Sequence, residues 1–171
     1  MLCSYNFGKT VVGGTFERTK SLNKPPHALR TAVAALSDRH GLEGNKIAQY
    51  MDEMVEHYPL LREKSCYQGA EHDQLFQAAY DHRGGDDDCS GCDPQRLVPR
   101  PPRRDSLPAI HYGLIASANQ VMRDTRTRDR LRDELEVLCF EMEAAGFLDH
   151  FPCLVIRGIC DYADSRKNMR W

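Results

Sequence analysis

The pattern of apolar and polar positions predicts short strands alternating with helices. Val137 to Phe140 is an apolar run rich in β-forming residues, and Cys153 to Ile159 is a second one. Residues 144–151 between them are compatible with a helix, which Pro152 ends. Ala109 to Ser117 is a third, nearly continuous apolar run, which is typical of a parallel strand buried on both faces. We therefore expect an α/β protein with a mainly parallel central sheet.

Three further segments have helical periodicity. The first helix is expected to open at Pro25-Pro26 and to end at Gly41, and the second follows from Gly44. Both read as amphipathic core helices, with apolar faces formed by Leu29, Val33 and Leu36 in the first and by Ile47, Met51, Met54 and Val55 in the second. A charged surface helix is expected from Arg123 to Glu136, with Leu131 and Leu135 on its inner side.

The N-terminal segment, Met1 to Phe16, holds aromatic and β-branched residues punctuated by glycine. It predicts one or two short strands with a turn at Gly13-Gly14. Gly8-Lys9-Thr10 resembles the end of a phosphate-binding loop. That loop requires another glycine five residues before Gly8, where Cys3 stands, so the phosphate-loop interpretation is excluded.

Residues 81–105 contain too few apolar side chains to form a core, and we expect a long exposed loop insert there. Cys89-x-x-Cys92 supplies half of a zinc site, and no second Cys pair at suitable spacing exists, although Cys66 and His82 could in principle complete it. The alternatives are a redox-labile thiol pair or a plain loop. We expect no metal.

Two other polar stretches favour a solvated surface. Glu71-His72-Asp73 could in principle bind a metal, but such a triplet is usually solvated. Arg96 to Arg104 is basic with interleaved prolines and lacks the aromatic residues that stack on bases, so a solvated linker is favoured over a nucleic-acid site.

Length, charge and cysteine content limit the number of domains, the class of partner and the cellular location that we expect. A length of 171 residues suggests one domain, and a net charge of -2 argues against a nucleic-acid partner. The seven cysteines are an odd number and no secretory signal precedes them, which favours a reducing, cytoplasmic location. No apolar run approaches the roughly 18 residues of a membrane helix, so no membrane partner is expected.

The candidate chemistry lies after two of the predicted strands. Glu141-Met142-Glu143 ends one apolar run and Asp161 ends the next. In open α/β sheets, ligands bind outside the carboxyl ends of the strands, so we expect both groups of carboxylates in one site. The plainer alternative is that Asp161 simply pairs with Arg157 or Arg166.

These residues also carry a resemblance. Glu-Met-Glu-Ala-Ala-Gly at 141–146 and Val-Ile-Arg-Gly-Ile-Cys-Asp-Tyr-Ala-Asp at 155–164 resemble the nucleoside phosphorylase and nucleosidase superfamily, whose pattern is Glu-Met-Glu-(Ala/Gly) followed by a strand ending Arg-x-Ile-Ser-Asp. Residues 5–10, 13–14 and 21–26 are similar to its fungal branch, in which the domain often precedes signalling or repeat modules. The resemblance implies one partial domain over residues 1–171, truncated at both ends: an incomplete three-layer α/β/α sandwich with a mixed, mainly parallel sheet.

The resemblance implies a role for each matching residue. Glu143 would grip the O2′ and O3′ hydroxyls of ribose, Met142 would lie against the sugar, and Glu141 would stand beside it. Asp161, with a pKa raised by burial, would protonate N7 of a purine as the catalytic acid. The expected base-binding residues are Ser117, Val121, Met122 and Cys160.

Two positions depart from the family pattern. Cys160 replaces the usual serine, and a thiol is the weaker hydrogen-bonding partner. Ala118 replaces the usual glycine, which would cost about 1 kcal/mol if the backbone there has a positive φ.

The implied function is cleavage of the N-glycosidic bond of purine nucleosides, with nucleotides as further substrates. Phosphorolysis, with phosphate as co-substrate, and hydrolysis both stay open, because the residues that would activate the nucleophile belong to a part of the family domain without a match here. No cofactor is expected, the complete domain is a possible homo-oligomer, and the fragment is expected to be inactive alone. The alternative is an inactive purine-sensing or protein-interaction module in a fungal signalling protein.

Overall fold

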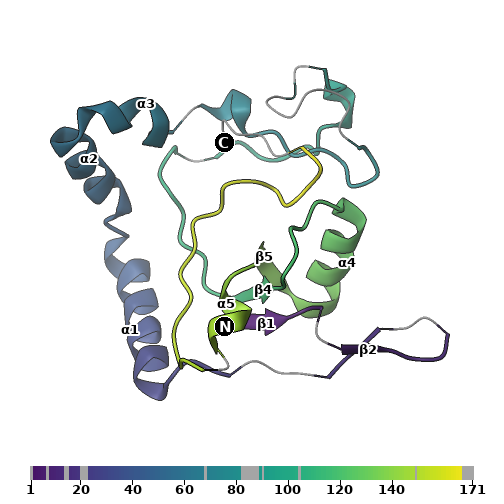
Figure 1. Cartoon of the computed structure of the whole chain (residues 1–171). Coiled ribbons are helices and arrows are strands. Elements are labelled where there is room, and N and C mark those ends of the chain that lie inside the picture. Colours follow the sequence, from purple (N-terminus) through teal and green to yellow (C-terminus); the bar gives the residue numbers. More distant parts are fainter. Residues whose placement is uncertain are drawn as a thin grey trace.

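A computed structural model describes the chain except for residues 1, 7, 14–15, 20–22, 68, 82–88, 90, 104, 149 and 167–171. Its centre is a three-stranded sheet in the order β1 (Leu2–Ser4), β4 (Leu114–Ser117), β5 (Val137–Glu141). Both pairs of strands are parallel. Helices flank this sheet (Figure 1), which confirms the expected α/β class.

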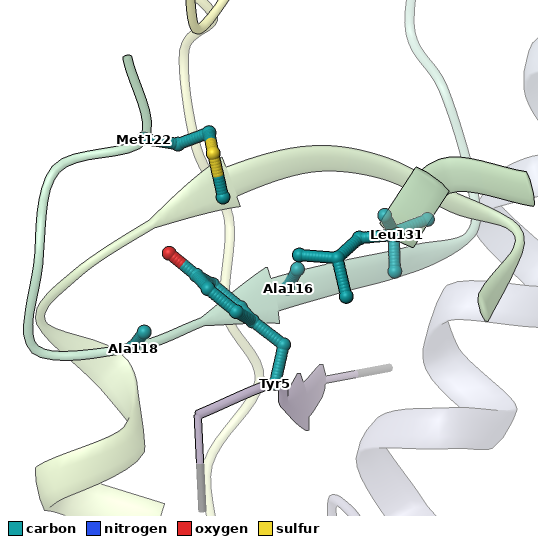
Figure 2. Close-up of a cluster of buried hydrophobic side chains, with 6 residues drawn as sticks. Tyr5, Ala116, Ala118, Met122 and Leu131 are labelled. Carbon is teal, nitrogen blue, oxygen red and sulfur yellow. The ribbon is translucent and has the colours of Figure 1, made fainter. Parts of the chain in front are cut away.

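The core lies on one face of the sheet. Its buried members come from the residue directly after β1, from β4, the loop after β4, α4 (Thr125–Leu135) and β5: they are Tyr5, Ala116, Ala118, Met122, Leu131 and Val137. Figure 2 shows the Tyr5 ring lying across the strands with its hydroxyl directed toward Met122. Tyr5 also meets Phe140 edge to face, with ring centroids 5.6 Å apart. Apolar residues of segments far apart in sequence thus make one core.

The charged helix predicted before β5 is α4. Asp124 precedes it, and its side chain accepts a hydrogen bond from the backbone N–H of Thr127 at 2.8 Å, which is a regular N-cap. Leu131 is buried and Leu135 packs against the core cluster, as the spacing predicts. The helix ends where Glu136 takes a left-handed conformation with φ of 54°.

The N-terminal segment forms more strands than expected. After β1, the strands β2 (Gly8–Thr10) and β3 (Phe16–Arg18) pair antiparallel as a hairpin. Gly13 has a φ of 95° at the turn, a conformation that favours glycine, so the predicted turn is confirmed there, while Gly14 lies outside the described residues. An ion pair of 3.2 Å between Arg18 and Glu134 ties the hairpin to α4.

The two helices predicted after Pro26 form, but the first one is not a core helix. Helix α1 (His27–Glu43) passes through Gly41 and ends at Gly44, whose φ is 77°. It buries none of its residues, and Leu29 and Leu36 are 38% and 43% exposed. Periodicity identifies the residues that share a face, but not whether another element covers that face. Helix α2 (Ile47–His57) does bury Val55.

A short turn of 3-10 helix, η1 (Pro59–Leu61), and α3 (Arg62–Ser65) continue from α2. Figure 1 shows α1, α2 and α3 along one side of the sheet and α4 on the other. Within the part of the chain that the structure describes, no helix is long and apolar enough to span a bilayer.

The predicted loop at 81–105 is not uniformly solvated. Residues 82–88, 90 and 104 lie outside the described residues. Of the rest, Cys92 is buried, Pro94–Arg96 forms a 3-10 turn (η3), and Leu97 makes a β-bridge with Phe76. A separate 3-10 turn, η2 (Ala70–His72), precedes Phe76. The segment therefore packs against residues 73–77.

Two predicted strands differ from the structure. The run from Ala109 to Ser117 forms a strand only from Leu114, because the chain bends at Gly113. Cys153 to Ile159 forms no strand, and Ile156 and Ile159 are 83% and 47% exposed. No strand among the described residues pairs with this segment, and β-structure requires a neighbour. Between β5 and this segment, α5 (Ala144–Leu148) confirms the predicted helix in a shorter form.

Candidate functional site

The three parallel strands end at one level with polar side chains. Ser4 of β1 is opposite Ser117 of β4, and Ser117 is opposite Glu141 of β5. Their exposed fractions are 6%, 0% and 7%, so this last rung of the sheet is both polar and buried. Buried polar groups need hydrogen-bond partners, and the partners of this rung determine the shape of the loops beyond it.

Glu141 organises the Glu-Met-Glu turn. Its Oε2 accepts hydrogen bonds from the backbone N–H groups of Glu143 at 2.9 Å and Ala144 at 2.8 Å. The Ser117 Oγ accepts a hydrogen bond from the backbone N–H of Ala145 at 3.0 Å. Together these two side chains hold the start of α5 against the end of β4, so that Glu141 serves as an anchor inside the turn.

The charge of Glu141 is stabilised by the same contacts. Burial alone would raise the pKa of this carboxyl, but hydrogen bonds from the Ser117 hydroxyl and from the backbone of Ala144 and Glu143 outweigh burial and lower the pKa below its ordinary value of 4.5. Among the described atoms, Glu141 Oε1 is buried and has no hydrogen-bond partner. A carboxylate with one free buried oxygen is retained here at an energetic cost.

Replacing Glu141 by glutamine is expected to lower the free energy of unfolding by about 0.5–2 kcal/mol at pH 7, which is the range for loss of a capping side chain. Because the folded-state pKa lies below the ordinary value, this stabilisation is present above pH 4.5 and is lost as the pH falls through the folded-state pKa. Urea unfolding at pH 7 and pH 3 measures it, with Glu43→Gln at an exposed position as the control. A pH-independent difference would contradict the anchoring role.

Glu143 and Met142 point the other way, toward solvent. Met142 is 44% exposed, and the Glu143 side chain is 53% exposed. The Glu143 Oε2 accepts a hydrogen bond from the Met142 N–H at 3.3 Å and lies 3.0 Å from Arg157 Nη2. Both contacts reach the same carboxylate oxygen. The ion pair brings the segment that contains Asp161 alongside the Glu-Met-Glu turn.

Asp161 does not follow a strand, contrary to the sequence prediction, since residues 153–160 form none. Its Oδ1 accepts a hydrogen bond from the Ala163 N–H at 2.8 Å, and its Oδ2 lies 3.7 Å from the Cys160 thiol, which donates to it. Asp161 shares with His72, Gln74 and Cys89 a hollow of ≈ 10 Å³, about the volume of one water and too small for a purine. Among the residues that line this hollow, Glu143 does not occur.

The other predicted base-binding residues fall into two groups. Ser117 is fully buried and Met122 is 8% exposed within the core, so both support the loop from inside. Val121 is 47% exposed and Cys160 is also exposed, so these two side chains are open to solvent. Ala118 is absent from the residues with positive φ in the described chain, so alanine in place of the family glycine carries no strain.

Asn6 and Asn119 lie just beyond the polar rung and were not among the site residues predicted from the sequence. The amide nitrogen of the Asn6 side chain donates to Asn119 Oδ1 at 2.5 Å, and Ser4 Oγ lies 3.4 Å from Asn6 Oδ1. The Tyr5 hydroxyl donates to the Gln120 carbonyl at 3.3 Å. Polar residues directly after β1 were the available signal, but only the parallel pairing of β1 with β4 brings them to this edge.

A second polar network lies next to Asp161. Asp73, expected to be solvated, has a side chain only 11% exposed and accepts hydrogen bonds from Arg100 at 3.1 Å and from the Tyr162 hydroxyl. Burial and the hydrogen bond to Asp73 raise the pKa of Tyr162 to about 12. The prediction for Glu71-His72-Asp73 was therefore wrong for Asp73.

Neither arginine proposed as a partner of Asp161 is bonded to it. Arg157 pairs with Glu143, whereas Arg166 is 2% exposed and pairs with the buried Asp164 at 3.2 Å. The Arg166 guanidinium also lies 4.2 Å from the centre of the Phe76 ring. Arg166 therefore serves to fix the C-terminal segment to the loop that contains Phe76.

The Cys89 and Cys92 thiols lie close together. Burial, together with the neighbouring Cys92, raises the pKa of Cys89 to about 11, so that its thiolate is disfavoured at neutral pH. His82, which could have helped to complete a zinc site, lies outside the described residues. No cluster of three or more His, Cys, Asp or Glu side chains suited to a metal occurs among the residues described.

A hollow of ≈ 360 Å³ lies elsewhere, lined by Gln77, Ala79, Tyr80, Asp81, Asp93 and Arg96. Its volume is within the range of small-molecule pockets. It contains neither residues of the Glu-Met-Glu turn nor Asp161, and its acidic and basic lining residues are exposed. We therefore place the candidate site at the carboxyl edge of the sheet, where the buried rung orders the turn.

No protein-family model matches this chain, and no solved structure matches it. The chain is 39% identical over 167 residues to a protein of Hyaloscypha variabilis that is described as a nucleotide-binding leucine-rich repeat (NLR)-like protein. The alignment covers 98% of this chain and 16% of that protein. The chain is thus similar, over almost its whole length, to a small part of a much longer fungal NLR-like protein.

Proposed function

We propose that this chain recognises a purine nucleoside or nucleotide at the carboxyl edge of its parallel sheet and acts as a sensing module within an NLR-like protein. The observation that supports the proposal is that the residues of the Glu-Met-Glu turn have different positions and roles. Glu141 is buried and fixes the turn, while Glu143 and Met142 are presented to solvent. A turn held from inside in this way positions its outer side chains with little freedom.

The outer side chains suit a ribose. A carboxylate can accept hydrogen bonds from two vicinal hydroxyls, and Glu143 is the exposed carboxylate of this turn. Met142 beside it offers an apolar, polarizable surface for the sugar ring. Arg157 shares Oε2 of Glu143, so that a bound sugar would displace or join an existing ion pair. An exposed pair of this kind costs little to rearrange.

We assign the base end to Asp161, with Cys160 and Val121 as further base-binding residues, on the strength of the sequence motif. The Glu143–Arg157 ion pair supports this assignment, because Arg157 belongs to the same short segment as Asp161. The ≈ 10 Å³ hollow beside Asp161 must widen to admit a purine. Binding is therefore expected to draw the segment at 153–161 toward the sheet edge.

The relative from Hyaloscypha variabilis supports a sensing role more than a metabolic one. That protein is described as nucleotide-binding and as containing leucine-rich repeats. This chain corresponds to 16% of that protein, so a recognition module attached to a larger receptor fits the lengths.

Cleavage of the N-glycosidic bond is the second candidate function. The Cys160 thiol and the Ala163 N–H both donate hydrogen bonds to the Asp161 carboxylate, and these bonds hold the carboxylate in a defined orientation. A fixed carboxylic acid can protonate the leaving base, while water or phosphate attacks the sugar. Glu143 would hold the ribose in this reaction as in simple binding.

One calorimetric series tests both candidates. We expect adenosine, guanosine, inosine or one of their nucleotides to bind the 171-residue chain. Adenine should bind more weakly because it lacks the ribose, and uridine should bind least. Chromatography of the same samples, with and without phosphate, detects free base. Binding without release supports the sensing module, and release of adenine supports the enzyme. If no purine nucleoside or nucleotide binds, both candidates are wrong.

A further inference from the structure

The segment that begins at Arg96, the last residue of η3, carries a proline-arginine pattern that takes no part in the candidate site. Its sequence is Arg96-Leu97-Val98-Pro99-Arg100-Pro101-Pro102-Arg103. Prolines have φ fixed near −65° and force the preceding residue into an extended conformation. Leu97 already has φ of −63° and ψ of 142°, which are the values of a polyproline II helix. Three prolines within four residues extend this conformation.

A polyproline II helix has three residues per turn, so its side chains form three edges. The side chains along one edge of this segment contact other residues of the same chain. Leu97 is half-buried and bridges to Phe76, the Arg100 guanidinium binds Asp73 at 3.1 Å, and the Arg103 guanidinium donates to the Leu107 carbonyl at 2.9 Å. These residues recur every third position. The strand is therefore clamped along one side and already extended.

A second edge faces solvent. Arg96, Pro99 and Pro102 are all exposed, and Pro101 beside them is exposed too. The Arg96 side chain is 56% exposed, and its ion pair with Asp93 is long at 3.9 Å. Pro99 and Pro102 thus stand one turn apart, about 9 Å at a rise of roughly 3.1 Å per residue, and Arg96 directly precedes the extended run.

We propose that Arg96-x-x-Pro99-x-x-Pro102 is a docking strand for a protein module of the SH3 type, with an aromatic-lined groove and an acidic pocket at one end. Such modules bind extended proline-rich segments that keep the polyproline II form. The prolines would fill the aromatic groove, and Arg96 would enter the acidic pocket. Because the clamp through Arg100 holds the strand extended before binding, less ordering entropy is lost on docking.

The segment fits a nucleic acid or a lipid surface less well. It contains no aromatic residue to stack on bases. All three of its described arginines are exposed, but Arg100 and Arg103 donate hydrogen bonds to the protein at 3.1 and 2.9 Å, whereas the ion pair of Arg96 with Asp93 is long at 3.9 Å. A regular spacing of proline and arginine favours a groove with matching pockets.

Fluorescence titration of the 171-residue chain with a set of isolated SH3 domains tests the proposal, with a WW domain for comparison. We expect at least one SH3 domain to bind with a micromolar dissociation constant. The double variant Pro99→Ala/Pro102→Ala should weaken that binding about tenfold or more, and so should Arg96→Glu, which leaves every proline in place. Pro59→Ala, at another exposed proline, should have no effect.

Circular dichroism confirms that each variant is folded. The proposal is overturned if no SH3 domain in the set binds, or if the double proline variant binds as the unmodified chain does. It is also overturned if only Arg96→Glu weakens binding, or if the chain binds phosphatidylserine vesicles or single-stranded RNA but no SH3 domain. Those outcomes would describe a general basic surface.

Discussion

Replacing Glu143 by glutamine is expected to weaken the binding of adenosine by about 5- to 150-fold, which corresponds to 1–3 kcal/mol for one lost charged hydrogen bond. Glutamine keeps the shape of the side chain and one carbonyl acceptor, but it loses the charge that can hold two ribose hydroxyls. Adenine lacks the sugar, so its affinity should hardly change. Isothermal titration calorimetry with the two ligands measures both effects.

The chain offers a matched control for this variant. Glu134 is also partly exposed and paired with an arginine, Arg18, at 3.2 Å, but it lies on α4 away from the turn. Glu134→Gln should leave the affinities for adenosine and adenine unchanged. The assignment of the sugar end is wrong if Glu143→Gln abolishes adenine binding and spares the riboside.

Leu131→Ala is expected to lower the free energy of unfolding by about 2–5 kcal/mol. Leu131 is 4% exposed and packs in the cluster that joins α4 to the sheet (Figure 2), so that truncation leaves a cavity next to Tyr5 and Val137. Urea unfolding followed by circular dichroism measures the change in stability. Because α4 packs against the sheet through this cluster, the substitution should also weaken adenosine binding at the sheet edge.

Leu60→Ala is the control for this substitution. Leu60 is 93% exposed, and removing the same atoms there should change the free energy of unfolding by less than about 0.5 kcal/mol. Equal effects of the two variants would show that the cluster around Tyr5 is not the core that holds the sheet and α4 together.

The elements predicted best from the sequence are those whose signals are local. The charged run with Leu131 and Leu135 four residues apart predicts α4, and the apolar run before Glu141 predicts β5. The run from Cys153 to Ile159 has equally strong β propensity, but a strand also requires a neighbouring strand, and none among the described residues pairs with it. Helix α1 is a similar case. Its periodicity identified the residues that share a face, but it did not show whether another element covers that face.

The candidate site was predicted in part. The sequence placed Glu141, Met142 and Glu143 at the carboxyl end of a strand, where the structure has them. It did not separate their roles, because burial of Glu141 depends on its pairing with Ser117, which is 24 residues earlier in the chain. Asn6 and Asn119 were missed for the same reason: only the register of β1 and β4 brings them within hydrogen-bonding distance.

The most direct test of ribose recognition compares adenosine with 2′,3′-dideoxyadenosine, which lacks both vicinal hydroxyls, on the unmodified chain and on Glu143→Gln. If Glu143 holds these hydroxyls, the unmodified chain should prefer adenosine by about 5- to 150-fold, and the preference should nearly disappear in the variant. An equal preference in both proteins would show that another group reads the sugar and would contradict the site proposed at the end of β5.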